Sequence, residues 1–101
     1  GLPRDVTKIL LVHEPDFADS VDDSSIVLQL SGHSHGAQIC LPGMRPVLKP
    51  GGGRNYPSGL ERTSRGLWVY TNRGIGVAMP PVRINCPAEI TLLTLTATRQ
   101  C

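Results

Sequence analysis

Hydrophobic residues along the chain gather in short runs separated by polar, glycine-rich turns. Residues 8–13 form a continuous apolar run that ends in His13, and residues 26–30 form a second run. Continuous rather than alternating hydrophobicity is typical of strands buried on both faces of an α/β sheet. Between the two runs, a proline with acidic residues in its turn predicts a short helix over residues 15–21.

The second half of the chain has a weaker pattern. Residues 37–41 fit either a third short strand or a return segment. Residues 42–63 contain four prolines and three consecutive glycines, which predict a long irregular segment. Residues 66–72 predict another strand. Residues 89–98 end in alternating Leu or Ala and Thr, a period of two that predicts a last strand with one wetter face.

Length and charge limit the classes to which the protein can belong. The chain has 101 residues, enough for one small domain, and a formal net charge of +2 without a basic run. This charge gives no support to nucleic-acid binding, and no apolar stretch approaches the roughly 20 residues that span a bilayer. The chain starts without Met and enters an apolar strand almost at once, so we expect it to be a piece of a longer protein.

The three cysteines predict neither a zinc knuckle nor a disulfide scaffold. Cys40, Cys86 and Cys101 are widely spaced and form no C-x-x-C pair. We therefore interpret them as ordinary buried or terminal thiols.

All three histidines lie where predicted strands end. His13 closes the first strand, and His33 and His35 follow the second, in the segment Gly-His-Ser-His-Gly. In an extended segment, residues two apart point to the same side, so His33 and His35 can present both imidazoles to one pocket. Imidazole binds zinc, copper, iron or manganese, so the pattern predicts a metal site without identifying the metal. The alternative is three loop histidines without a ligand, and for His13 alone this alternative is the stronger one.

These histidines stand in longer segments that resemble a known family. The segments are His13 followed by Glu-Pro, then Leu-Gln-Leu-Ser-Gly-His-Ser-His-Gly at 28–36, and residues 36–42, 70–76 and 81–93. Together they resemble the C-terminal half of a calcineurin-like metallophosphoesterase of the bacterial membrane-associated branch. The resemblance implies a two-sheet α/β/β/α sandwich, to which this chain contributes the β-rich C-terminal half as one portion of a single domain.

The resemblance also implies a function and a set of ligands. Family members hold two divalent metal ions, here manganese, zinc or iron, in a dinuclear centre that hydrolyses phosphate esters. By resemblance, His13 and His33 would ligate one metal and His35 the other. Such a centre polarises a phosphoryl oxygen and activates a water molecule.

The family's earlier motifs are absent from this chain. These motifs are an Asp-x-His pair, a Gly-Asp segment and a Gly-Asn-His segment, so the sequence offers no catalytic residue of its own. We therefore expect the chain to be inactive alone and to need the missing N-terminal half of the same domain. The alternatives are a non-catalytic metal-binding module that retains the histidine motif and a structural β-rich domain with incidental histidines. Localisation stays open between a membrane-associated and a cytoplasmic full-length protein, and this chain has no membrane segment.

Two further residues are candidates for substrate binding. Arg73 lies between a strand end and a Gly-x-Gly turn, where its guanidinium could bind phosphate oxygens. The adjacent Asn72 is a second candidate, although asparagine at such a position more often bonds the backbone of its own turn. A solvated loop residue is the alternative for Arg73.

Overall fold

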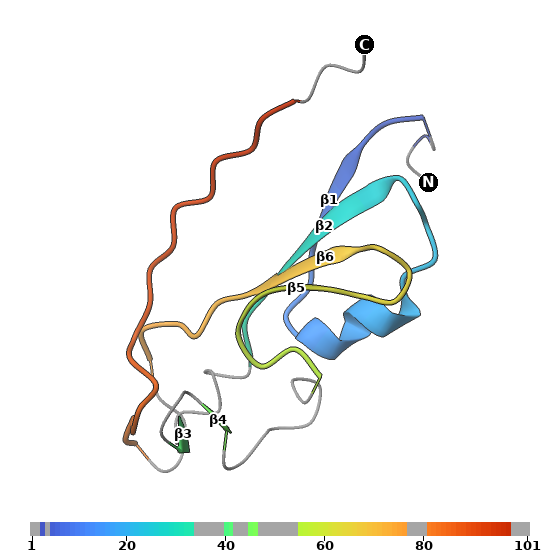
Figure 1. Cartoon of the computed structure of the whole chain (residues 1–101). Helices are drawn as coiled ribbons and strands as arrows, with labels where there is room; N and C mark the ends of the chain where they lie inside the picture. The colour runs from blue at the N-terminus through green and yellow to red at the C-terminus, as the bar shows by residue number, and fades with distance from the viewer. Residues whose placement is uncertain are drawn as a thin grey trace.

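The main element of the computed structural model is a four-stranded mixed sheet with the spatial order β1-β2-β6-β5 (Figure 1). The structure describes residues 3, 5–33, 40–41, 45–46, 55–76 and 81–97. Strands β1 (Lys8–Leu11), β2 (Ile26–Ser31) and β6 (Trp68–Thr71) are parallel, and β5 (Gly59–Arg62) pairs antiparallel with β6. The strands expected over 8–13, 26–30 and 66–72 are thus confirmed, each to within two residues at its ends.

A short helix covers one face of the sheet. The segment Pro15–Ser20 forms the 3-10 helix η1, with proline in its first turn and Asp16 beside it, which confirms the expected helix. Its buried side joins β2, β6 and the residues before β5 in the core of the described part of the chain. The core consists of Ala18, Val21, Tyr56, Leu67 and Val69, with Leu10 and Ile26 packed against it.

The prediction that residues 42–63 are irregular is wrong in part, because this segment contains two strands. A two-residue ladder pairs β3 (Cys40–Leu41) with β4 (Arg45–Pro46), and β5 lies at the end of the segment. The backbone holds β5 to β6 through a tight turn, in which Thr63 N–H donates to the Leu67 carbonyl at 2.8 Å. Main-chain hydrogen bonds hold this hairpin together, and they do not require a hydrophobic pattern. Strand β5 has few apolar residues, so the sequence pattern did not predict it. Strand β3 lies within the third strand considered over 37–41, of which 37–39 are outside the described residues.

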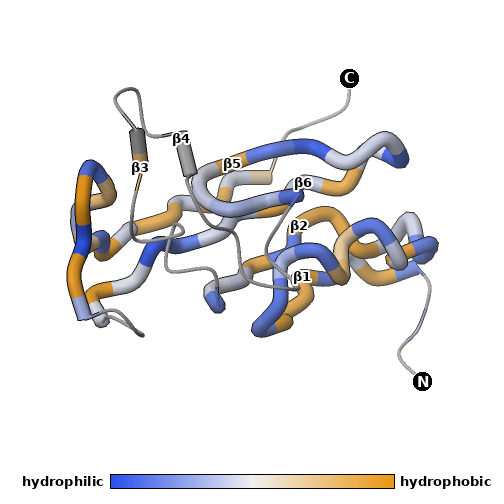
Figure 2. The backbone as a smooth tube through the Cα atoms, turned by 90° about the horizontal axis from the view of Figure 1, so that it is seen from below, coloured by the Kyte–Doolittle hydropathy of each residue, from blue (hydrophilic) through white to orange (hydrophobic). Residues whose placement is uncertain are grey.

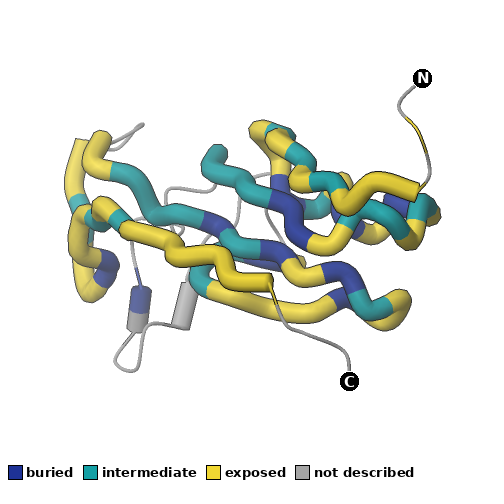
Figure 3. The backbone as a smooth tube through the Cα atoms, turned by 90° about the horizontal axis from the view of Figure 1, so that it is seen from above, coloured by how far each residue is buried: buried dark blue, intermediate teal, exposed yellow. Residues whose placement is uncertain are grey.

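The face of the sheet opposite η1 is apolar and partly uncovered. The register aligns Ile9, Leu28 and Trp68 across three strands, and Leu11, Leu30, Tyr70 and Leu60 across four. We call these seven residues the open face. Leu11 is 75% exposed, so the expectation that the first strand is buried on both faces is wrong for this chain. Figure 2 shows hydrophobic residues along the strands, and Figure 3 shows that buried, intermediate and exposed positions alternate along the same backbone.

The strand predicted over 89–98 is not formed by the described residues 89–97. The segment runs extended along the side of the sheet opposite η1 without joining its ladder (Figure 1). Leu93 to Leu95 border a hollow of about 350 Å³ with Leu28, Leu60 and Trp68 of the open face. Ile90 and Leu92 are 86% and 91% exposed. The predicted period of two is present in the sequence, but a strand also requires a partner for its backbone groups.

The observed sheet with one short helix is compatible with the predicted α/β class. Within the described stretches 5–33 and 55–76, two parallel pairs and one antiparallel pair of strands make up the sheet. No helix in the described part of the chain has the length and apolar character needed to cross a membrane.

Candidate metal centre

The turns after β1 and β2 bring two of the three histidines together. The chain leaves β1 at Val12, whose N–H donates to the Leu30 carbonyl at 3.1 Å, and the Gly32 N–H donates to the His13 carbonyl at 3.1 Å. These bonds continue the parallel ladder beyond the last paired residues. Because parallel strands end at the same edge of a sheet, His13 and His33 meet there, where ligands bind in open α/β sheets.

The two imidazoles are in direct contact. His33 Nδ1 lies 3.1 Å from His13 Nε2, and the ring centroids are 4.8 Å apart at an interplanar angle of 68°. One nitrogen donates a proton to the other, and the tautomers decide which. His33 has a φ of +66°, a left-handed conformation that is uncommon for a residue other than glycine. Strained backbone of this kind is frequent at functional sites.

The nitrogen separation suits two ligands of one metal ion. A tetrahedral metal with metal–nitrogen bonds of about 2.0–2.1 Å separates two ligand nitrogens by roughly 3.3 Å, so a shift of a few tenths of an ångström would admit the ion. Among the described residues, no cluster of three or more His, Cys, Asp or Glu side chains completes a metal site. His35, predicted to bind the second metal, lies outside the described residues. The described part of the chain therefore brings together two imidazole nitrogens, and metal binding by His13 and His33 stays a prediction.

A buried glutamine positions the turn that carries His13. Gln29 is fully buried in the middle of β2, and its Nε2 donates to the Pro15 carbonyl at 3.1 Å and to Ser31 Oγ at 2.9 Å. Pro15 follows His13 by two residues, and Ser31 precedes His33 by two. Gln29 thus ties the segment that follows His13 to β2, and it also bonds the last residue of β2, two positions before His33. Sequence reasoning missed this residue, although a glutamine inside an otherwise apolar strand is a usable signal.

The structure gives Arg73 a partner within the chain. Its Nη2 forms a 2.9 Å ion pair with Glu89 Oε2, and its Nε donates to the Pro87 carbonyl at 3.1 Å. Both side chains of the ion pair are about one-fifth exposed. The guanidinium therefore joins the turn after β6 to the segment before residue 90, and phosphate binding by Arg73 stays a prediction. The alternative of a solvated loop arginine does not describe this geometry.

Asn72 has the backbone role that was the alternative to substrate binding. Its Oδ1 accepts a hydrogen bond from the Gly74 N–H at 2.6 Å, which closes an Asx turn. Its Nδ2 donates to Thr91 Oγ1 at 3.2 Å. Substrate binding by Asn72 stays a prediction, to be reconciled with these two bonds.

Arg83 was not singled out in the sequence, yet it supports this turn from the other side. Its Nη2 donates to the carbonyls of Arg73 at 2.7 Å, Gly74 at 3.2 Å and Gly76 at 2.6 Å. Three carbonyls converging on one guanidinium fix the path of the turn. No local pattern marks an arginine for such a role, because its partners lie seven to ten residues earlier.

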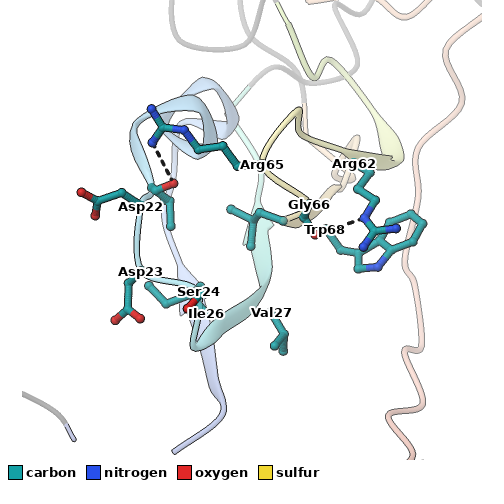
Figure 4. Close-up of a pocket in the computed structure, with 11 residues that line it drawn as sticks. Asp22, Asp23, Ser24, Ile26, Val27, Arg62, Arg65, Gly66 and Trp68 are labelled. Atoms are coloured by element: carbon teal, nitrogen blue, oxygen red, sulfur yellow. Dashed lines mark hydrogen bonds between the residues drawn. The ribbon is translucent and has the colours of Figure 1, made fainter. Parts of the chain in front are cut away.

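A second hollow, of about 350 Å³, lies at the opposite end of the strands and contains no histidine (Figure 4). Its charges are mixed: Asp22 and Asp23 face it together with Arg62 and Arg65. Both arginines are already engaged. Arg62 lies over the Trp68 ring at 5.1 Å and donates to Gly66, and Arg65 donates to the Val21 carbonyl at 3.3 Å. The hollow therefore shows no converging set of donors for one ligand.

Several curated proteins similar to this chain are named metallophosphoesterases, and others are named for related activities. The chain is 46% identical over 90 residues to the uncharacterized metallophosphoesterase YkuE of Bacillus subtilis (strain 168), a match that covers 89% of this chain and 31% of YkuE. It is 34% identical over 95 residues to the phosphodiesterase YaeI of Escherichia coli (strain K12), covering 94% of this chain and 33% of YaeI. The resemblance to metallophosphoesterases is confirmed.

A third relative is named for a specific substrate. The chain is 36% identical over 95 residues to the UDP-2,3-diacylglucosamine pyrophosphatase LpxG of Chlamydia trachomatis serovar D, covering 84% of this chain and 28% of LpxG. The chain spans about a third of the length of these metallophosphoesterase relatives. The sequence matches no family model and no solved structure.

Proposed function

We propose that the protein is a metal-dependent phosphoesterase and that this chain supplies part of its metal site. The observation that carries the proposal is the 3.1 Å approach of His33 Nδ1 to His13 Nε2 at the carboxyl ends of two parallel strands. The two nitrogens come from residues 20 apart in sequence and have the spacing of ligands that share one ion. Homology to metallophosphoesterases supports the same reading.

The full site would hold two divalent ions, manganese, zinc or iron, with His13 and His33 on one and His35 on the other. When bound, such ions supply Lewis acidity toward phosphate oxygens and toward water. The described residues contribute the nitrogen ligands, and the Gln29 bonds hold their turns in register. The substrate class is a phosphate ester, and the names of YaeI and LpxG make phosphodiester and pyrophosphate bonds the first to test.

We further propose that the remainder of the same domain packs on the open face and completes a two-sheet sandwich. Leu11, Leu60 and Trp68 of this face are 75%, 58% and 41% exposed, and residues 89–97 run beside the face without forming a strand with any other described residues. Apolar area of this kind is costly in water, and unpaired extended backbone invites strand addition. The relatives are about three times as long as the stretch they share with this chain, which leaves enough protein to cover the face.

The proposal is tested first by metal binding. Calorimetric titration of the chain with Mn²⁺ and with Zn²⁺ should give a binding isotherm. The substitution His33→Ala should weaken the metal affinity at least tenfold, because one of the two neighbouring imidazole ligands is lost. The matched control is Ser64→Ala, at an exposed polar residue between β5 and β6 with no proposed contact to metal, which should leave the affinity unchanged.

Hydrolysis is the second measurement. The full-length protein should hydrolyse a chromogenic phosphodiester in the presence of the metal, and the 101-residue chain alone should not. Metal binding without hydrolysis by the full-length protein would favour the non-catalytic metal-binding module. Unchanged metal affinity in the double variant His33→Ala, His35→Ala would contradict both readings and favour a structural domain with incidental histidines.

A further inference from the structure

Two cysteines that are 46 residues apart in sequence lie in neighbouring segments of the folded chain. Cys40 begins β3, and its N–H donates to the Ile84 carbonyl at 2.8 Å. Asn85 Nδ2 donates back to the Cys40 carbonyl at 3.2 Å. Asn85 has a φ of +52°, a left-handed conformation that asparagine tolerates, and the turn it makes brings the next residue, Cys86, against Cys40.

The two cysteines are neighbours in the interior of the protein. Both are buried thiols, and the bonds from the Cys40 N–H to the Ile84 carbonyl and from Asn85 to the Cys40 carbonyl hold residues 84–86 beside Cys40. Burial, followed by the proximity of Cys86, raises the pKa of the Cys40 thiol. On the other side, Arg83 Nη1 donates to the Cys86 carbonyl at 3.2 Å and to Cys86 Sγ at 3.7 Å. Both thiols are thus shielded from solvent, at 4% exposure for Cys40 and 1% for Cys86, and the Cys86 sulfur has a cationic donor beside it.

We propose that Cys40 and Cys86 are a disulfide-forming pair, oxidised by a small-molecule disulfide such as oxidised glutathione. The Cys86 sulfur attacks one glutathione sulfur, gives its proton to solvent and releases a glutathione thiolate, which leaves a mixed disulfide. The Cys40 sulfur then loses its proton, attacks the Cys86 sulfur and releases the second glutathione. Two protein thiols are oxidised, and one oxidised glutathione is reduced to two molecules of glutathione.

The bond would fasten the segment that follows the histidine motif to the segment that supports the Arg73 turn. Cys40 lies five residues after His35, and Cys86 lies three residues after Arg83, which donates to three carbonyls of that turn. A disulfide here closes a long loop of the unfolded chain and therefore stabilises the folded state. The inference rests on the described contacts of the two cysteines and is independent of the proposed phosphoesterase activity.

The third cysteine provides an internal test of whether folding selects the pair. Cys86 and Cys101 are only 15 residues apart in sequence. In an unfolded chain, loop closure favours the 15-residue loop over the 46-residue loop by about fivefold. The chain is incubated with oxidised glutathione, with and without urea, then blocked with an alkylating agent and mapped by protease digestion and mass spectrometry.

We expect the Cys40–Cys86 peptide pair to dominate without urea by at least tenfold and the Cys86–Cys101 pair to dominate in urea. Cys101→Ser should retain the native disulfide, and Cys40→Ser should lose it. In the Cys101→Ser chain, oxidation should raise the midpoint of urea unfolding, and added reductant should restore the original midpoint. The proposal would be overturned if the chain without urea formed mainly the Cys86–Cys101 disulfide. It would also be overturned if the folded chain formed no disulfide at a ratio of oxidised to reduced glutathione that oxidises the denatured chain.

Discussion

Ionisation of Tyr56 should destabilise the protein at high pH, because the folded structure holds its hydroxyl in the neutral form. Tyr56 belongs to the core beneath η1, and its hydroxyl donates to Asp19 Oδ1 on that helix. Burial, followed by the hydrogen bond to Asp19, raises the pKa of Tyr56 from 10 to about 12. Both causes act against the tyrosinate, since it would be poorly hydrated and would face a carboxylate.

The size of the effect follows from this difference in pKa. A shift of two pKa units corresponds to about 2.7 kcal/mol between the protonation states. Because the folded pKa lies above the unfolded value, the stabilisation is fully present below pH 10 and is lost as the pH rises toward 12. At about pH 11.5 the protein should have lost roughly 2 kcal/mol of its free energy of unfolding through this one group.

The assay separates Tyr56 from the other tyrosine of the chain. Tyr70→Phe leaves Tyr56 as the one remaining tyrosine, and its ionisation is followed by tyrosinate absorbance. The midpoint should lie near 12 in the folded protein and near 10 in urea. In parallel, urea unfolding of the wild type and of Tyr56→Phe should show a stability difference that shrinks by roughly 2 kcal/mol between about pH 8 and about pH 11.5.

A folded-state midpoint near 10 would refute the reasoning, and so would a stability difference that is independent of pH. Asp19→Asn tests the order of the causes. Because burial is the larger one, this variant should lower the pKa of Tyr56 only part of the way back to 10. A complete return would make the carboxylate, and not burial, the dominant cause.

Three other predictions concern the core, an exposed carboxylate and the ion pair near the candidate site. Val69→Ala should cost about 2 kcal/mol in urea unfolding because Val69 is fully buried, whereas Val27→Ala, at a 43% exposed position, should cost less than about 0.5 kcal/mol; equal losses would contradict the assigned core. Hydrogen bonds from a neighbouring serine lower the pKa of Asp23 from 3.8 to about 2, so wild-type stability should fall between those pH values and the fall should be smaller in Asp23→Asn. Glu89→Gln should cost about 1 kcal/mol by breaking the ion pair with Arg73, and added salt should narrow the gap; a gap unaffected by salt would argue against a charge interaction.

The part of the candidate site that was predictable is the pair of histidines that follow predicted strands. His13 and His33 follow apolar runs, so the pattern alone placed them at one edge of a sheet, and the structure brings their rings together. The neighbours of Arg73 were not predictable in the same way. Its ion-pair partner Glu89 is 16 residues away, and Arg83 is 10 residues away, so neither contact leaves a periodic signal.

The elements β1, η1, β2 and β6 were predictable from sequence alone, because runs of apolar residues and a proline with acids in the first turn fix local structure through nearest neighbours. The sequence also determined the histidine motif and, through it, the family resemblance. Only the tertiary structure decided that Asn72 closes its own turn, that β5 joins the sheet and that Cys40 meets Cys86. Residues 89–97 illustrate the physical reason: they carry the pattern of a strand, but a strand forms only where another backbone satisfies its hydrogen bonds, and within the described residues they have no place in the sheet.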